Sequence, residues 1–456
     1  MEKIYLTPED QGMLDPYGLV RKSLMRLRSE HEFYAQPSPY WRISPEETFD
    51  RYVSLLDKRS QSRKSKPYVE YNTELRSKWG PQGGQYAWSE LVKIAEQYYT
   101  FADDPVHVSK VLLDGRDYLL RRFKYRIEVS GYPMRYEHRY YNTNAAIPTG
   151  LKKGTYYAEV TGGKPWRHMF PAVPGQRRMR RGNRLIFQDS VQNVRYIETT
   201  LNAVRSWLVA EFPEYFDAWA NPELSLNKRL TRAVNARAYF VETDYQKMDQ
   251  HLSWDVVSTL VLPVYELLSP NTYLSFAAAI EELYSQPLYM GDYMLVGRHN
   301  TFSGQGITND FETLYTVMLV LGVALNMGLL DSLEFAALGD DLTIALYKGK
   351  QQKAEHLRSM LIDVSNQANM IIHNDEKSRI SCGETRFCRR VYYQGAYCYD
   401  GENYAGCYPT ILALNSMRQP ERPAESAGLA ALADLQRLDN CIGTPEYEDL
   451  LHFVCR

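Results

Sequence analysis

The sequence predicts an α+β fold that contains several strands and helices, and three observations support this prediction. Residues 237–244 are rich in aromatic and β-branched side chains, which is typical of a strand. Two apolar runs, 333–338 and 342–346, flank the bend Gly339-Asp340-Asp341 and predict two further strands. Between and after these strands, apolar residues recur at spacings of three and four, which predicts helices.

Length and composition set wide limits. The chain has 456 residues, which suffices for roughly three average domains or for one large multilobed enzyme. Its formal net charge is -2, so any nucleic-acid partner must be bound by local basic clusters. The first residues lack a signal-peptide pattern, and the longest apolar stretch, near 315–325, is short and interrupted by glycine. We expect a soluble intracellular protein that does not bind a membrane.

The six cysteines all lie late in the chain, at spacings that fit neither a zinc knuckle nor a recognisable disulfide framework. We interpret them as reduced thiols. The first 85 or so residues are predicted to form an extension, because a polar basic run at 58–66 and a glycine-rich loop at 80–84 interrupt them. A solvated linker and an RNA contact both explain the basic run.

Two helices are predicted between the first strand and the bend. One runs from about residue 250 to 268 and stops before Ser269-Pro270, as helices do ahead of proline. The other begins near Thr308, after the pliable loop Ser303-Gly304-Gln305-Gly306, and continues through residue 321. Along the chain, both helices lie between Asp244, at the end of the first strand, and Asp340 at the bend.

Beyond the bend, a third helix is predicted over 357–364, followed by a short strand at 369–372 and a turn at Asn374-Asp375. A last helix is expected within residues 424–438.

The acids at the strand ends carry the chemistry. At about 4 Å two carboxylates repel by about 4 kcal/mol at an effective dielectric near 20, unless a cation lies between them. Gly-Asp-Asp is also a good turn sequence, so a solvated hairpin tip explains the bend alone equally well. Nucleotidyl transfer needs two divalent ions held by carboxylates of neighbouring strands. Asp244 and Asp340, with Asp341, fit that need and predict a site for two Mg²⁺ or Mn²⁺ ions.

Three short motifs together resemble motifs A, B and C of viral RNA-dependent RNA polymerases. They are DYQKMD at 244–249, SGQGIT at 303–308 and GDD at 339–341, in the order and at the distances of a palm domain. Each motif alone occurs by chance in many proteins, but the three in order, in these strand and helix contexts, are specific. The chain looks most like the polymerases of small double-stranded RNA viruses, the partitivirus and picobirnavirus group, over about residues 140–400.

This resemblance implies a right-handed polymerase with fingers, palm and thumb, a ferredoxin-like antiparallel palm sheet and many helices. The implied activity is RNA-templated addition of ribonucleotides to an RNA 3′ end, in viral genome replication and transcription. The domains expected on this basis are an N-terminal extension that bridges toward the fingers and thumb (1–85), fingers (86–235 and 259–300), palm (236–258 and 301–393) and thumb (394–456).

The resemblance also assigns roles around the nucleotide. Asp249 would read the sugar, because a carboxylate accepts a hydrogen bond from a ribose hydroxyl, whereas reverse transcriptases carry a bulky aromatic there. Ser303, Gly304 and Thr308 would shape the base-pair pocket and the template path. Many viral polymerases have asparagine four residues after this threonine, but here the residue is Glu312. A capping box formed by Asn309 and Glu312 is an equal alternative.

Residues 175–187 pack five arginines into eight positions and resemble motif F, the fingers ribbon whose cations meet the incoming triphosphate and the template. Arginine suits this role because its planar fork matches phosphate oxygens. Arg184 is the first choice for the nucleotide contact and Arg180 the second. The arginines expected to contact RNA are Arg177, Arg178 and Arg181. A surface basic loop or localisation signal is the alternative.

Three further motifs are expected by resemblance. The template-guiding motif G is sought at 142–150 or 161–166. Lys377 matches the motif D lysine that protonates the leaving pyrophosphate as a general acid, although a plain surface lysine also fits. Residues 386–393 resemble the motif E primer grip, in which Arg389 and Arg390 would contact RNA.

The expected partners are RNA template and product, ribonucleoside triphosphates and a viral capsid protein, and the expected location is the virion in the host cytoplasm. Two alternatives remain open. One is a reverse transcriptase, which deoxynucleotides would reveal. The other is a catalytically inactive RNA-binding or packaging protein with a palm-like fold, although such a module has no reason to keep Asp244 and Asp340 where they repel phosphate.

Overall fold

The computed structural model describes residues 1–29, 36–60, 66–81, 83, 87–123, 127, 146–147, 150–151, 169–179, 182–220, 225–347, 349–374, 377–394, 406–422 and 424–455. The strands are β1 (Glu2–Tyr5), β2 (Val173–Met179), β3 (Gly182–Gln188), β4 (Tyr239–Thr243), β5 (Leu288–Tyr289), β6 (Tyr293–Val296), β7 (Leu333–Leu338), β8 (Asp341–Leu346), β9 (Ile380–Cys382), β10 (Glu384–Phe387) and β11 (Arg390–Tyr393).

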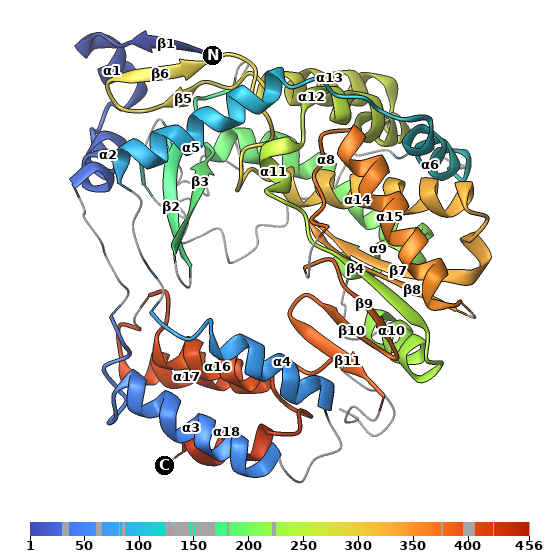
Figure 1. Ribbon diagram of the computed structural model, residues 1–456. Helices are drawn as coiled ribbons and strands as arrows, with labels where there is room; N and C mark the ends of the chain where they lie inside the picture. The colour runs from blue at the N-terminus through green and yellow to red at the C-terminus, as the bar shows by residue number, and fades with distance from the viewer. Residues whose placement is uncertain are drawn as a thin grey trace.

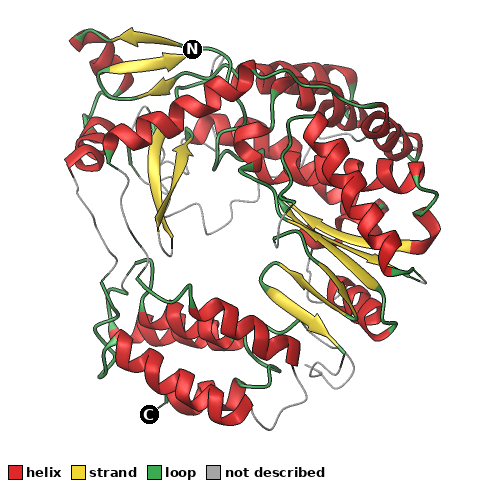
Figure 2. Cartoon of the chain, viewed as in Figure 1, coloured by secondary structure: helices red, strands yellow, loops and turns green. Residues whose placement is uncertain are grey.

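Helices flank the central strands and make up the other end of the molecule, near the C-terminus (Figures 1 and 2). The α-helices are α1 (Pro8–Leu14), α2 (Leu19–Ser29), α3 (Pro45–Ser60), α4 (Lys66–Arg76), α5 (Trp88–Thr100), α6 (Lys110–Arg121), α8 (Val191–Glu211), α9 (Pro213–Phe216), α10 (Ser225–Asn235), α11 (Met248–His251), α12 (Trp254–Val256), α13 (Pro270–Leu283), α14 (Thr308–Asn326), α15 (Gln351–Gln367), α16 (Thr410–Arg418), α17 (Ala427–Asp439) and α18 (Tyr447–Val454). Short 3₁₀ segments are η1 (Phe101–Asp103), η4 (Asp217–Trp219) and η7 (Leu330–Ser332).

The central sheet has the strand order β7-β8-β4-β9, and all neighbouring strands are antiparallel. Along the chain, β4, α14, β7, β8, α15 and β9 follow one another in the β-α-β-β-α-β order of a ferredoxin-like unit. A long insertion, from α11 to β6, separates β4 from α14. The predicted ferredoxin-like antiparallel sheet is therefore confirmed.

Both faces of this sheet are covered, and β4 shows how its sequence achieves this. Successive side chains of a strand point to opposite faces. Val241 is fully buried in the core that α14 and α15 share, whereas its neighbour Phe240 is fully buried in a second core with α10. A strand buried on both faces reads as a continuous apolar run, which explains the strong strand signal of this segment.

Helix α14 is apolar on nearly every face because it runs through the middle of the molecule. It crosses α6 where two glycines meet. A Cβ on Gly322 would lie 2.1 Å from the Val111 carbonyl oxygen, and a Cβ on Gly115 would lie 2.1 Å from the Met318 carbonyl oxygen. The two backbones approach so closely that only glycine fits at the crossing.

The prediction of one continuous helix over 250–268 is wrong. Helix α11 ends at His251, Ser253 caps the short α12, and a π turn (η5, Val257–Val261) and a 3₁₀ segment (η6, Leu262–Leu267) follow. Pro263 has no N–H to donate to the Thr259 carbonyl, and that oxygen accepts from Arg116 at 2.8 Å instead. The predicted end before Ser269-Pro270 is confirmed.

The predicted strand at 369–372 is also wrong, because the backbone conformation of its first residue does not fit a strand. Asn369 adopts a φ of +59°, and only an isolated bridge between Ile372 and Tyr245 is formed. Even so, this segment runs beside the end of β4, because the His373 N–H donates to the Asp244 carbonyl at 3.0 Å. The helices predicted near 308–321, 357–364 and 424–438 are confirmed as α14, α15 and α17.

The N-terminal residues contact two separate parts of the molecule. Strand β1 pairs with β6, at the end of the molecule that carries α5 and β2–β3 (Figure 1). Helices α3 and α4 instead share a hydrophobic core with α16 and α18, in which Tyr52 and Tyr68 lie beside Ile411 and Leu414. The division of the chain into the predicted fingers, palm and thumb stays a prediction.

None of the helices in the described ranges combines the length and apolar character that crossing a bilayer requires.

Candidate active site

The bend between β7 and β8 is held in place by α14. Gly339 has a φ of +60°, which glycine adopts without strain. Its N–H donates to the Thr313 hydroxyl at 2.7 Å, and the Thr316 hydroxyl donates to its carbonyl oxygen at 3.2 Å. The bend therefore presents Asp340 and Asp341 from a fixed backbone at the end of the sheet.

Asp244 lies at the same end. Thr243 pairs with Leu342 at the end of the β4–β8 ladder, and Asp244 and Asp341 are the next residues on the two segments. The charges of Asp244 and Asp340 both act on Asp341. The structure thus places the three acids that the sequence predicts as a site at one end of the sheet, near enough for their charges to interact.

These acids repel one another. Asp340 and Asp341 keep exposed surface, but the surrounding protein withholds enough water to raise the pKa of both carboxyl groups. Burial and then the Asp340 charge raise the pKa of Asp341 to about 6. For Asp340, burial is again the largest cause of the raised pKa, and the charges of Asp244 and Asp249 act in the same direction. A cation among the acids would relieve this repulsion.

Asp244 contacts two basic groups. Its Oδ2 lies 3.9 Å from the Lys377 Nζ and 4.0 Å from the His373 Nε2, and the Lys377 Nζ lies 3.2 Å from the same His373 nitrogen. The contacts form because residues 371–373 run beside residues 244–246. Lys377, selected from the sequence as a proton donor, therefore lies next to the acids.

The donors fit Mg²⁺ or Mn²⁺ in kind, because hard divalent ions take carboxylate oxygens and complete their shell with water and phosphate oxygens. Among the residues that the structure describes, no three His, Cys, Asp or Glu side chains stand close enough together to hold an ion. Joint binding by the three acids requires Asp244 to exchange its contacts with Lys377 and His373 for the ion.

Asp249 lies beside the acids in a buried position. It is only 6% exposed, on α11. Its Oδ2 accepts a hydrogen bond from the Tyr98 hydroxyl at 2.9 Å and from the Arg184 guanidinium at 3.3 Å, and its Oδ1 accepts from the Gln250 N–H at 3.0 Å. Arg184, the residue predicted first for the phosphate contact, is thus paired with Asp249, the residue predicted to read the sugar.

Glu312 lies inside the site, and the capping-box interpretation is wrong. Helix α14 begins at Thr308 with Ile307 as its cap, so Asn309 is already in the helix. Glu312 is buried, and a Cβ built on Gly339 would lie 3.2 Å from its Oε2. Burial, followed by the charges of Asp249 and Asp340, raises the pKa of Glu312 well above its usual range.

The loop before α14 is closed by its own hydrogen bonds. The Thr308 hydroxyl donates to the carbonyl oxygens of Phe302 and Gln305, and the Ser303 carbonyl accepts from the Phe187 N–H at 2.8 Å. Gly304 has a φ of +96° and packs against β3. These residues connect the loop to the arginine ribbon, and in this state the Thr308 hydroxyl stabilises the loop itself.

The arginine-rich segment forms the predicted antiparallel ribbon, β2 and β3, with Arg177 directly opposite Arg184. Arg177 lies 4.0 Å from Glu421, which precedes α17. The backbone of Arg178 belongs to β2. Arg180 and Arg181, which were predicted to bind the nucleotide and RNA, fall outside the described residues.

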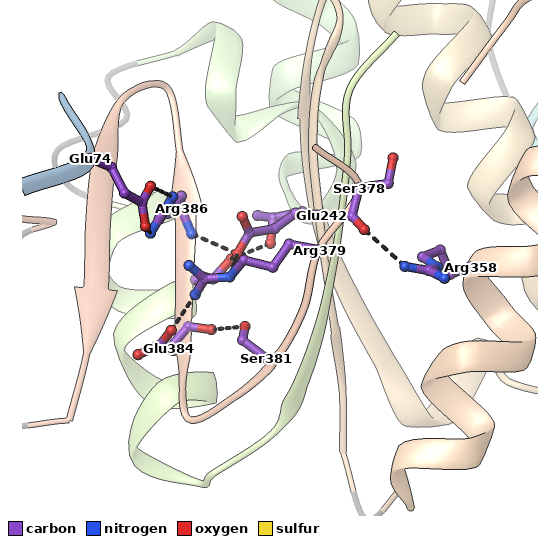
Figure 3. A network of polar contacts seen from close by, with 10 residues as sticks. Glu74, Glu242, Arg358, Ser378, Arg379, Ser381, Glu384 and Arg386 are labelled. Atoms are coloured by element: carbon purple, nitrogen blue, oxygen red, sulfur yellow. Dashed lines mark hydrogen bonds and ion pairs between the residues drawn. The ribbon is translucent and has the colours of Figure 1, made fainter. Parts of the chain in front are cut away.

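The hairpin β10–β11 corresponds to the predicted primer grip and is anchored on the sheet (Figure 3). Glu242 of β4 accepts from the Arg386 N–H at 3.0 Å and from the Thr385 hydroxyl at 3.1 Å. The Arg386 side chain forms a double hydrogen bond with Glu74 of α4, at 2.8 and 2.9 Å. The hairpin therefore joins α4 to β4, the strand that directly precedes Asp244.

The two arginines of this hairpin differ. Arg389 has a φ of +65° in the tight turn, next to Cys388, whose thiol contacts Asp341. Arg390 donates to the Gly406 carbonyl at 2.9 Å and to the Asn440 carbonyl at 3.3 Å. Arg389 lies near the acids, whereas Arg390 holds the following segment, and an RNA contact by either stays a prediction.

Both segments considered for motif G lie largely or wholly outside the described residues. Of 142–150, only residues 146, 147 and 150 are described, and 161–166 is not described. The location of a template-guiding motif stays a prediction.

Three side chains at the site were not selected from the sequence. His373 lies only four residues before Lys377, so its proximity could have been inferred. Glu242 is an acid inside an apolar strand, which is a usable signal. Tyr98 lies 151 residues from its partner Asp249, and no local pattern reveals that pair.

A ferredoxin-like sheet with acids at one strand end and at the neighbouring bend is the arrangement expected of the palm of a right-handed polymerase. No protein-family model and no curated protein matches the sequence. Many solved structures do match, and two of them are picobirnavirus polymerases. An RNA-dependent RNA polymerase of a human picobirnavirus aligns with a TM-score of 0.79 and 18% identity, over 98% of this chain and 89% of that chain.

The insertion-loop deletion mutant of a human picobirnavirus RNA-dependent RNA polymerase aligns with a TM-score of 0.80 and 18% identity, over 98% of this chain and 92% of that chain. At this level of identity the likeness establishes the fold. The right-handed polymerase fold, and the resemblance to polymerases of small double-stranded RNA viruses, are confirmed at that level.

Proposed function

We propose that this chain is an RNA-dependent RNA polymerase, which adds ribonucleotides to an RNA 3′ end under the direction of an RNA template. One observation carries the proposal. Asp244, Asp340 and Asp341 meet at one end of a ferredoxin-like sheet, within a fold like that of picobirnavirus polymerases. The Arg184–Asp249 pair beside them supplies both a phosphate contact and a sugar contact.

When held by Asp244, Asp340 and Asp341, two Mg²⁺ or Mn²⁺ ions would activate the attacking 3′ oxygen and offset the charge of the leaving pyrophosphate. The Arg184 side chain is half exposed, so its guanidinium can leave Asp249 for the triphosphate of an incoming nucleotide. The Asp249 Oδ2 is then available to accept a hydrogen bond from a ribose hydroxyl.

Lys377 would donate a proton to the leaving pyrophosphate. Its position beside Asp244 supports this role, because the transferred proton must reach the phosphates held near the acids. Ser303, Gly304 and Thr308 would line the base pair and the template path. Their loop is fixed against β3, which carries Arg184, so template and nucleotide would be positioned by one connected unit.

We also propose the division of the chain into fingers (86–235 and 259–300), palm (236–258 and 301–393) and thumb (394–456), with residues 1–85 as the bridging extension. The pairing of β1 with β6 and the shared core of α3, α4, α16 and α18 support the bridging role. The partners would be RNA, ribonucleoside triphosphates and a capsid protein, and the place of action a virion in the host cytoplasm.

The decisive experiment measures incorporation of labelled ribonucleotides by the full chain, with template RNA and Mg²⁺ or Mn²⁺. Asp340→Asn should lower incorporation by at least about 100-fold, because the acid supports several kcal/mol of transition-state stabilisation. Asp331→Asn is the matched control, since Asp331 is an exposed acid at the opposite end of β7. It should retain wild-type incorporation.

Other outcomes would contradict the proposal in distinct ways. Equal incorporation by wild type and Asp340→Asn would remove the acid assignment. Efficient synthesis with deoxynucleotides would indicate a reverse transcriptase. RNA binding with no incorporation under any condition would indicate an inactive packaging module.

A further inference from the structure

Tyr98 connects helix α5 to the site from far away in the sequence. It is 1% exposed, and its hydroxyl donates to the Asp249 Oδ2 at 2.9 Å. Its ring stands edge-on to Phe187 of β3, with centroids 4.9 Å apart, and to Phe302 of the loop before α14, at 5.6 Å. Tyr98 thus touches the three elements that carry Arg184, Asp249 and Ser303.

Arg184 and Tyr98, the two side chains that donate to Asp249, are not held equally firmly. The Arg184 side chain is 49% exposed and its hydrogen bond is 3.3 Å long, so a phosphate can draw it away. Tyr98 packs against the rings of Phe187 and Phe302, and its hydrogen bond to Asp249 is shorter. Its hydroxyl is uncharged, so a phosphate does not attract it as it attracts a guanidinium. Once Arg184 turns to a triphosphate, Tyr98 remains the described side chain that fixes the carboxylate.

We propose that Tyr98 is a positioning residue for sugar selection: its hydroxyl holds the Asp249 carboxylate in the orientation that accepts a hydrogen bond from the ribose 2′-hydroxyl. The inference rests on the proposed function, because it assigns part of the nucleotide discrimination of that same site. Without this donor the Asp249 carboxylate can adopt several orientations, and only some of them face the sugar. In the other orientations a ribonucleotide loses the hydrogen bond from its 2′-hydroxyl, whereas a deoxynucleotide has no such bond to lose. The preference for ribonucleotides over deoxynucleotides therefore falls.

The chain offers a matched control in the next residue. Tyr99 lies on the same helix, is also 1% exposed, and donates its hydroxyl to the Leu295 carbonyl at 3.1 Å. Tyr98→Phe and Tyr99→Phe therefore remove the same atom from equally buried rings. Only the first change affects a group at the site.

The test measures kcat/KM for UTP and for dUTP on one RNA template. Tyr98→Phe should lower the UTP to dUTP ratio by about three- to tenfold, the range expected for one hydrogen bond. Tyr99→Phe should leave the ratio unchanged. In an Asp249→Ala background, adding Tyr98→Phe should have no further effect on the ratio, because Tyr98 acts through that carboxylate.

The proposal is overturned if Tyr98→Phe lowers both kcat/KM values equally, which is the result of a purely structural role. It is also overturned if the ratio falls to the same extent in the Asp249→Ala background, and that comparison holds even where the single variant is less stable. A wild-type chain that incorporates no ribonucleotide refutes the proposed function, whereas a discriminating wild type with an unchanged Tyr98→Phe ratio refutes only this inference.

Discussion

Glu312 is a buried carboxyl whose neighbours are acids, and this makes the stability of the protein depend on pH. Burial and the charges of Asp249 and Asp340 raise its pKa in the folded chain well above the unfolded value. The folded state therefore holds a proton that the unfolded state releases, so the contribution of Glu312 to stability is full below the unfolded pKa. It is lost as the pH rises through the folded pKa.

We therefore predict that Glu312→Gln, which keeps the shape without the charge, unfolds at a higher temperature than wild type at pH 8. The expected gain is about 1–3 kcal/mol, the cost of leaving a buried polar group without a partner. At pH 5 the two proteins should differ little. Thermal unfolding with a chelator present measures this, and Glu266→Gln at an exposed position is the control. A gain of equal size at both pH values would contradict the prediction.

Single residues also show what a sequence reveals of a site. Asp244 and Asp340 could be identified because each lies in a short motif with a recognisable local context. Glu312 allowed two interpretations, because a capping residue and a side chain facing a substrate can stand at the same spacing. Tyr98 could not be identified, since a tyrosine in an amphipathic helix is indistinguishable from an ordinary core residue until its partner is known.

Helices α6 and α14 determine how the layer above the sheet packs, and their glycine crossing is a testable feature. Gly322→Ala should destabilise the protein by about 1–3 kcal/mol, the cost of an extra methyl in a close-packed interior. The added Cβ would clash with the backbone oxygen of Val111, which cannot move aside as a flexible side chain can. Denaturant-induced unfolding measures the loss.

Gly12→Ala in α1 provides the control, because nothing lies within 4 Å of the added Cβ. It should stabilise by up to about 1 kcal/mol, as alanine favours helix over glycine. The same chemical change is thus expected to have opposite signs at the two sites. Equal effects would show that the crossing is looser than described.

At the scale of elements, prediction succeeded where a local pattern dominates. The strand at 333–338 and the helices α14, α15 and α17 were predicted because apolar periodicity determines them. The segment 250–268 was mispredicted because periodicity persists through Pro263, while the helix cannot. The strand expected at 369–372 failed for a backbone reason, the positive φ of Asn369, which side-chain pattern does not report.

For the whole molecule, charge distribution matters more than net charge. The chain is nearly neutral, so RNA binding should depend on the ribbon β2–β3 rather than on overall attraction. The double variant Arg177→Ala/Arg178→Ala should make the dependence of log affinity on log salt less steep by about 1.4, since each lost phosphate contact with a single strand removes about 0.7. Filter binding at several salt concentrations measures the slope.

The control replaces two exposed arginines that lie outside the ribbon, Arg26 of α2 and Arg121 of α6. Arg26→Ala/Arg121→Ala removes the same net charge and should leave the slope unchanged. If both double variants lower the slope equally, binding depends on total charge and the ribbon has no special role.

The sequence could not indicate how the first 85 residues are used. Residues 58–66 looked like a linker because they are polar, and the flanking helices have ordinary amphipathic patterns. Their partners are far along the chain: Tyr68 donates its hydroxyl to the Tyr408 carbonyl, 340 residues away, at 3.0 Å. Contacts of that range leave no trace in local periodicity.

The core shared by α3, α4, α16 and α18 has a consequence for biosynthesis. A ribosome releases the first two of these helices long before the last two, so their tyrosines stay uncovered while more than 300 intervening residues are made. The helices on both sides of this core therefore assemble only after residues 410–454 have left the ribosome. Until then the nascent chain exposes the apolar faces of α3 and α4 to other proteins in the cell.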